Sequence, residues 1–338
     1  MAADGTDSWL TVACHLRSCP WADDNHEVAF AQIQLRSSNT QPTTVCELLR
    51  PFVQDRHVLL GPATFDCDTG ALLSIGDSKV SLAQIDLWRA PTDNDKGGAM
   101  SENWPEVRTS NLDSWLEAGL DRVQHQVNAV VLHSNQLVVT SQVGPAVLDR
   151  YLEVKTAFMA PDPKTLSVGI SILPKGPWSN LELPRLGFQL QLDSSAYESV
   201  RWHGYGPGEA YPDTRSGVRL GVYESTIDNM QTPYITPQEN GTRLDVRYAR
   251  LLDNTGRGLC FVGQPSFGFA VRRWSTESLA TATRQTELTA SNRLFVHIDH
   301  AVSGVGSAST GPGVQSPYIV KLVEGQSVHF AFDIQVIE

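Results

Sequence analysis

The alternation of apolar and polar residues is the feature that most constrains this chain. Apolar side chains recur at every second position over 166–172, 186–192 and 328–336. This period of two puts one face of a strand on a core and the other towards solvent, as in antiparallel sheets. Turns between the strands are supplied by 19 prolines and 26 glycines. We therefore predict an all-β fold, a large antiparallel β-sandwich.

One helix is predicted within this β-rich pattern. Asn111 can cap a helix that carries Leu112, Trp115 and Leu116 on one face, and Gly119 is placed to end it. We expect this helix to cover a face or an edge of the sheet.

The composition of the chain argues against several classes of function. The net charge of −11 disfavours a surface that binds nucleic-acid phosphates. The sequence contains no run of about 18 apolar residues, so no membrane span is predicted. The first residues lack a signal-peptide pattern. The five cysteines are scattered without a C-x-x-C pair, which favours a reducing compartment and no zinc site. We expect a cytoplasmic protein without a metal or other cofactor.

Two unequal parts are expected along the chain. Residues 1–35 hold two strand-like runs but are too few to form a core of their own, so we expect the last strands of another sandwich. Residues 36–44 form a polar linker, and residues 45–338 form the large domain.

Polar and glycine-rich residues are concentrated in four stretches, the first of which is LWRAPTDNDKGG at 87–98. Asp93 and Asp95 could hold a cation, but the spacing lacks the glycine and the distal glutamate of a calcium loop. Side-chain to backbone hydrogen bonds in a turn are the favoured interpretation.

The second stretch, RWHGYGPGEAYPDT at 201–214, combines aromatic rings with carboxylates. Trp202, Tyr211, Glu209 and Asp213 are therefore candidate sugar-binding residues, because rings stack on sugar faces and carboxylates bind hydroxyls. The alternative is that the two rings fill the core. Glu209 and Asp213 are also a possible hydrolytic carboxylate pair, but their spacing does not show that they converge.

The third and fourth stretches are TPYITPQENG at 232–241 and 297–314, which opens with HIDH and continues as a glycine-rich run. The third predicts an ordered loop leading into a strand at 243–248. In the fourth, His297 and Asp299 would share a face of a strand while His300 points away. A histidine–aspartate hydrogen bond is therefore favoured over a metal site, and the following loop lacks the lysine of a phosphate-binding loop.

In their order and spacing, these four stretches resemble the signature segments of the C-terminal domain of long β-galactosidases, in glycoside hydrolase family 2. FDCDTGAL at 65–72 resembles the opening of that domain, and HEVAFAQIQL at 26–35 resembles the end of the immunoglobulin-like domain before it. The resemblance covers nearly the whole chain. It implies a sandwich of the galactose mutarotase type after a short remnant of an immunoglobulin-like sandwich.

The resemblance also implies where the chemistry lies in the family. The two catalytic glutamates belong to an upstream (β/α)8 barrel, and no βα repeat occurs here to supply them. The family's C-terminal domain contributes one side chain to the sugar site, and that position falls on Thr310. Thr310 removes a stacking platform but keeps a hydroxyl. His203 stands where the family has another aromatic ring.

Three hypotheses remain open at this level. The first is a non-catalytic, carbohydrate-binding small chain that completes a glycoside hydrolase whose barrel is on a partner chain. The second is a free-standing mutarotase-like sandwich that works as a sugar-binding protein, an isomerase or a biosynthetic enzyme. For it, His203, Glu209, His297 and Asp299 are candidate proton-transfer groups. The third is a scaffold with no ligand pocket.

Overall fold

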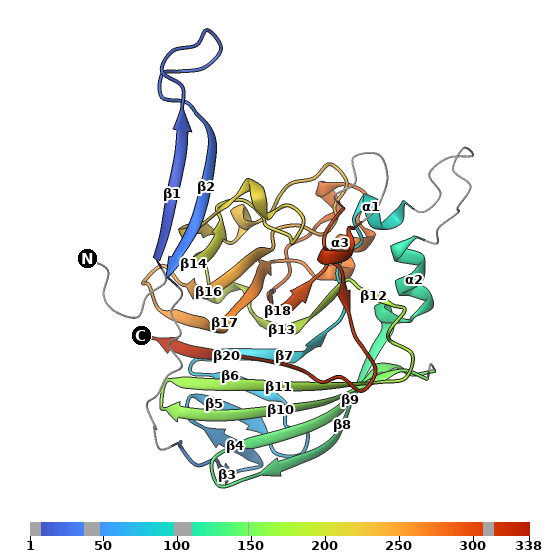
Figure 1. Ribbon diagram of the computed structural model, residues 1–338. Helices are drawn as coiled ribbons and strands as arrows, with labels where there is room; N and C mark the ends of the chain where they lie inside the picture. Colours follow the sequence, from blue (N-terminus) through green and yellow to red (C-terminus); the bar gives the residue numbers. More distant parts are fainter. Residues whose placement is uncertain (1–7, 37–47, 98–109, 148, 307–313) are drawn as a thin grey trace. The chain divides into compact units, whose positions relative to one another are not determined.

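Antiparallel strands make up most of the computed structural model, which describes residues 8–36, 48–97, 110–147, 149–306 and 314–338 (Figure 1). The chain divides into two compact units, Met1–Cys46 and Glu47–Glu338. Within the described ranges, no helix is long and apolar enough to cross a membrane.

The first unit contains a two-stranded antiparallel hairpin of β1 (Ser8–His15) and β2 (Glu27–Arg36). Its apolar side chains are unusually exposed, between 45% and 65% at Leu10, Val12, Val28, Ile33 and Leu35. A two-stranded hairpin buries too little apolar surface to be stable by itself.

The second unit is built on one long, curled sheet of antiparallel strands. Its main path runs β3-β4-β5-β6-β7-β13-β18-β17-β20-β11-β10-β9-β8, and β16, β14 and β15 branch from β17 in that order. The bounds are β3 (Phe52–Gln54), β4 (His57–Leu60), β5 (Ala63–Asp66), β6 (Leu72–Ile75), β7 (Ser78–Asp86), β8 (Val123–Leu132), β9 (Leu137–Pro145), β10 (Tyr151–Asp162), β11 (Thr165–Lys175), β13 (Arg185–Asp193), β14 (Ser199–Gly206), β15 (Arg219–Thr226), β16 (Arg243–Leu252), β17 (Gly258–Arg272), β18 (Arg293–Val302) and β20 (Val328–Ile337).

Smaller elements complete this unit. A short ladder joins β12 (Glu182–Leu183) to β19 (Val320–Lys321). The α-helices are α1 (Asp93–Lys96), α2 (Asn111–Glu117) and α3 (Thr276–Thr281). Single 3-10 turns occupy Leu120–Arg122, Ser194–Ala196, Arg215–Gly217, Asp228–Met230, Gln285–Glu287 and Ser316–Tyr318.

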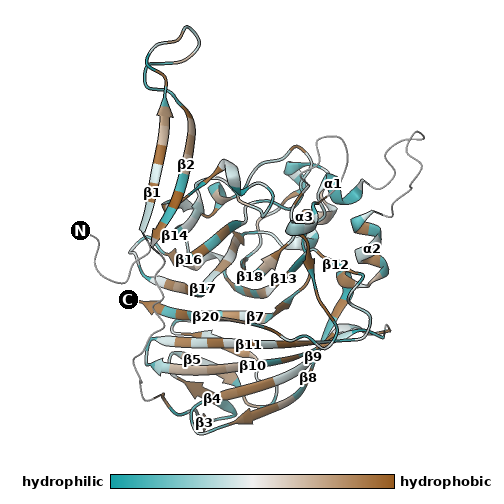
Figure 2. Cartoon of the chain, in the orientation of Figure 1, coloured by the Kyte–Doolittle hydropathy of each residue, from teal (hydrophilic) through white to brown (hydrophobic). Residues whose placement is uncertain are grey.

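The prediction of a large antiparallel sandwich is confirmed. The predicted strands at 166–172, 186–192 and 328–336 are β11, β13 and β20. Along β11 the apolar side chains from Leu166 to Ile172 are buried while those between them are partly exposed, and Figure 2 shows hydrophobic and hydrophilic residues interspersed along the strands.

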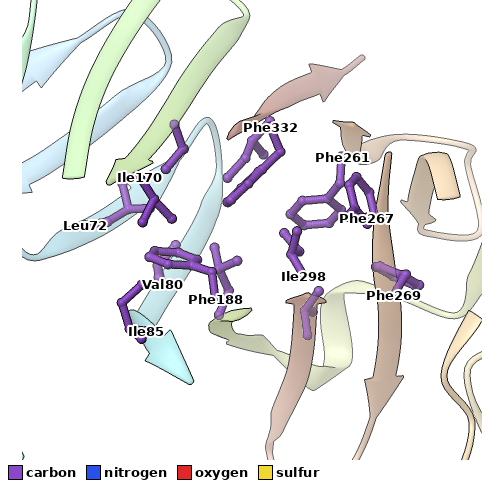
Figure 3. Close-up of a cluster of buried hydrophobic side chains, with 14 of the residues drawn as sticks. Leu72, Val80, Ile85, Ile170, Phe188, Phe261, Phe267, Phe269, Ile298 and Phe332 are labelled. Atoms are coloured by element: carbon purple, nitrogen blue, oxygen red, sulfur yellow. The ribbon is translucent and has the colours of Figure 1, made fainter. Parts of the chain in front are cut away.

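The core lies between parts of the sheet that are distant along its path (Figure 3). Phe65 of β5 lies 4.7 Å from Phe158 of β10 between ring centroids, and Phe188 of β13 lies 5.7 Å from Phe332 of β20. The sheet therefore curls so that it packs on itself, and each buried phenylalanine contributes about 1.5–3 kcal/mol.

The predicted helix is present as α2, with one change at its start. Ser110 rather than Asn111 is the N-cap: its backbone is extended and its side chain accepts a hydrogen bond from the Asp113 amide. The helix ends at Glu117, and Gly119 follows in the left-handed region at φ 70°. Trp115 is buried and donates its ring N–H to the Glu182 carbonyl, which ties α2 to β12.

Candidate functional site

The first and second of the four stretches bind the backbone of residues 303–306, which belong to the fourth. Arg89 donates to the carbonyls of Ser303 and Gly304, the latter at 3.0 Å. Asp213 accepts from the amides of Val305 at 3.1 Å and Gly306 at 2.8 Å. These contacts hold residues 303–306, which directly precede positions 307–313.

The first stretch forms this support through a one-turn helix rather than the loop expected. Thr92 caps α1 in a capping box with Asp95. Asp95 is fully buried and both of its oxygens lie 3.0 Å from the Arg89 guanidinium, while Asn94 donates to the Val305 carbonyl at 2.8 Å. The positive charge of Arg89 balances the negative charge of Asp95. No metal-ligating cluster of His, Cys, Asp or Glu occurs among the described residues.

The third stretch is bound to the first and the second. Glu209 accepts from the Gly241 amide at 2.8 Å, from the Thr232 hydroxyl at 2.9 Å and from the hydroxyl of Tyr234. The Asp93 amide donates to the side-chain oxygen of Gln238 at 3.0 Å. Segments far apart in sequence thus form one polar framework at this end of the sandwich.

A fully buried charge cluster lies next to this framework. Glu239 lies 3.1 Å from both Arg185 and Arg272, and it also accepts from the Tyr211 hydroxyl at 3.2 Å. Burial alone would raise the pKa of Glu239, but the charges of Arg272 and Arg185 hold that pKa well below its usual value. Glu239 therefore stays ionised and fixes the loop before β16 to the ends of β13 and β17.

Arg185 faces two further carboxylates. Its guanidinium lies 3.3 Å from Asp86 and 3.1 Å from Asp299. Burial raises the pKa of Asp299 to about 7 despite the opposing effect of Arg185. Gly187, between Asp86 and Asp299 in the sheet register, leaves room for these groups, because a Cβ there would lie 2.3 Å from Asp299 Oδ1.

His297 makes its hydrogen bond to a residue other than its predicted neighbour. Its Nδ1 lies 2.9 Å from Asp86 Oδ2 of β7, not against Asp299 on its own strand. Same-face residues of one strand are about 6.6–6.8 Å apart, whereas sheet neighbours can be closer. Burial and the charge of Arg185 lower the pKa of His297 to about 4, so its ring is neutral at pH 7.

The remaining predicted site residues differ in their surroundings. Trp202 is buried, with the Tyr223 ring 5.5 Å and the Arg243 guanidinium 5.4 Å from its ring. Tyr211 is buried as well, so both rings fill the interior. The His203 ring lies 5.9 Å from the Tyr248 ring on neighbouring strands. Thr310 lies outside the described residues.

The structure does not place the four predicted proton-transfer groups in one pocket. His297 and Asp299 share a face of β18 without exposed surface, whereas Glu209 is engaged with the loop at 232–241. Glu209 and Asp213 bind the backbones of different loops. Their assignment to catalysis or to sugar binding stays a prediction.

Sequence reasoning missed the arginines of this region. Arg185 and Arg272 stand at the ends of strands with their side chains on the face opposite the core residues Leu186 and Val271. An arginine at the boundary of a strongly apolar strand was the available signal, since a buried charge needs a partner.

Comparison with known proteins gives a consistent picture. The family model described as the β-galactosidase small chain matches residues 62–334. A β-galactosidase of Arthrobacter sp. strain B7 is 31% identical over 95% of this chain and 32% of its own length. The β-galactosidase of Aeromonas hydrophila is 30% identical over 90% of this chain and 30% of its own length.

The relatives are longer proteins, of which this chain spans about a third. Among solved structures, a galactose mutarotase related enzyme of Lactobacillus acidophilus is similar over 85% of this chain and 97% of its own, with a TM-score of 0.43 and 8% identity. A likeness of that degree says nothing about activity. The family match rests on the sequence, and the chain belongs to the β-galactosidase small-chain family.

Proposed function

We propose that this protein is the non-catalytic, carbohydrate-binding part of a β-galactosidase whose catalytic barrel is on a partner chain. The family match and the similarity to one third of complete β-galactosidases support it. A retaining glycosidase needs two carboxylates about 5–5.5 Å apart at an open sugar site. The family resemblance assigns that pair to the barrel.

The single observation that carries the proposal is the set of side-chain hydrogen bonds to the backbone of residues 303–306. Arg89, Asn94 and Asp213, from two of the family's signature stretches, all bind this short backbone segment. Of these three side chains Arg89 is fully buried and Asp213 is partly buried. Fixed polar contacts of this kind are useful where a following loop must present a side chain accurately. Thr310 is the side chain that we propose contacts the sugar in the completed enzyme.

The hairpin of β1 and β2 fits the same proposal. Its exposed apolar residues support the view that residues 1–35 belong to an immunoglobulin-like sandwich completed by strands of the partner chain. The linker at 36–44 would then join that sandwich to the large domain at 45–338.

Complementation is the direct test. The chain is mixed with the upstream two thirds of the Arthrobacter relative, and hydrolysis of a nitrophenyl β-galactoside is followed with each part alone and with both. We expect activity only from the mixture, and a stable complex on size-exclusion chromatography. A chimera that carries this chain in place of the relative's own last third checks for weak assembly.

Two variants sharpen the test. Asp213→Ala should reduce the activity of the mixture or chimera, while Asp228→Ala, on an exposed carboxylate paired with Arg273, should not. Hydrolysis by the chain alone would contradict the proposal. So would a chimera that is folded but inactive.

A further inference from the structure

A polar hollow beside Asp86 is separate from the framework at residues 303–306. It has a volume of about 100 Å³ and lies where the end of β7 meets the start of β8 and α3. Its polar lining comprises Gln84, Asp86, Asp121, His125, Gln189, Thr276 and Glu277.

Two residues of this lining have hydrogen-bonding capacity that the described residues do not fill. The hydroxyl of Thr276 is buried, with the residue 2% exposed, and it has no hydrogen-bond partner in the described structure. Gln189 accepts from Gln191 through its oxygen, which leaves its amide N–H groups to donate. An unsatisfied buried hydroxyl is costly, so a ligand that binds it recovers free energy.

Asp86 is the fixed acceptor of the hollow. Its carboxylate is held by Arg185, by His297 and by the Trp88 amide, and its side chain keeps 12% of its surface exposed. The charge of Asp86 is therefore already balanced, and Asp121 is paired with Arg122 at 2.9 Å. The third carboxylate of the lining, Glu277, is exposed to solvent, so the buried part of the lining suits neutral hydroxyl groups.

An apolar hollow adjoins the polar one. It has a volume of about 260 Å³ and shares Gln84, Ile85 and His125 with the first. Its apolar wall includes Leu72, Val80, Val139, Val154, Phe158 and Phe188. Figure 3 shows Leu72, Val80, Ile85 and Phe188 gathered on one side of the core. The side chains of this apolar wall are between 2% and 8% exposed, so the apolar surface open to a ligand is small.

We propose that the two hollows form one binding site for an amphiphilic hydroxylated molecule. A sugar or polyol head would bind Gln84, Asp86, Gln189 and Thr276, and an apolar substituent would enter the wall at Phe158 and Phe188. Planar amides and carboxylates suit sugar hydroxyls, and aliphatic and aromatic side chains suit an alkyl or aryl group. This site uses none of the groups that hold residues 303–306, so it does not rest on the proposed function.

Binding to the full chain is measured by isothermal titration calorimetry with three probes: hexyl β-glucoside, methyl β-glucoside and hexanol. We expect hexyl β-glucoside to bind tightest, because it alone fills both hollows. Thr276→Val should weaken its binding about tenfold, the effect of one lost hydrogen bond to a buried group. Thr64→Val, on a different hollow, is the control and should leave binding unchanged.

A second variant separates the two halves of the site. Ser141→Leu places a larger side chain in the apolar hollow and should remove the advantage of hexyl β-glucoside over methyl β-glucoside. Thermal unfolding of each variant shows that it is folded. The proposal is overturned if hexyl β-glucoside does not bind at millimolar concentration, or if its binding is the same in Thr276→Val as in the parent.

Discussion

The Nε of Arg185 and the Oδ1 of Asp299 lie 3.1 Å apart, with both side chains fully buried, yet neither atom has a hydrogen-bond partner within the described residues. Burial raises the pKa of Asp299 to about 7, and Arg185 only partly offsets this. Arg185 also faces Asp86 and Glu239. One guanidinium therefore serves three carboxyl groups, and Asp299 holds a proton below neutral pH.

This relationship predicts an effect of Asp299 on the pH dependence of stability. The pKa of Asp299 is about 7 in the folded state and 3.8 for an ordinary aspartate, so between these values the folded state binds one more proton than the unfolded state. Asp299 then contributes stability that is complete below pH 4 and lost as the pH rises through 7. Asp299→Asn should lose this contribution, at most about 1.4 kcal/mol per pH unit.

His297 acts in the opposite direction over nearly the same range. Its pKa falls from 6.5 to about 4, so its contribution is present above pH 6.5 and lost as the pH falls through 4. Urea unfolding between pH 4 and 8 should therefore give a steeper rise of unfolding free energy with pH for Asp299→Asn than for the parent. Parallel curves for the two proteins would refute the assigned proton on Asp299.

Asp213→Ala should loosen the backbone at residues 305 and 306. The substitution removes two hydrogen bonds to amides, and we expect a loss of about 1–3 kcal/mol. Hydrogen–deuterium exchange at Val305 and Gly306 should become faster, while exchange in β11 changes little. Unchanged protection at both amides would show that Asp213 does not hold this segment.

Arg89→Met should be among the most damaging single changes in the framework. It leaves the buried carboxylate of Asp95 without its partner, at an expected cost of about 3–5 kcal/mol. Asp95→Asn combined with Arg89→Met should recover part of that loss, because the unpaired charge is removed. Chemical unfolding of the four proteins of this double-mutant cycle gives the coupling energy, and simple additivity would exclude the pairing as its source.

Gly187→Ala tests the crowding around Arg185. Its Cβ would lie 2.3 Å from Asp299 Oδ1 and 2.9 Å from the Asp299 Cα, so a shift of the backbone is required. We expect destabilisation of about 1–3 kcal/mol. Gly217→Ala is the matched control, because nothing lies within 4 Å of a Cβ at Gly217, and its unfolding free energy should change by about 0.5 kcal/mol or less.

The alternation of apolar residues was sufficient to predict the antiparallel strands, since the apolar residues of each strand lie on its buried face. Leu166 to Ile172 and Val328 to Val336 show this directly, and they pair with each other as β11 and β20. The helix at 111–117 was equally local, although its cap moved by one residue to Ser110.

Partner choice in the buried cluster depended on the tertiary structure. The sequence by itself determined the sandwich and the family, because strand periodicity and the ordered signature stretches are properties of neighbouring residues. Only the curled sheet decided that His297 meets Asp86 across 211 positions of sequence and that Arg89 reaches Ser303 across 214. Strand order and loop closure determine such contacts. A buried charge forms its hydrogen bonds and ion pairs with the groups that the folded chain places within reach.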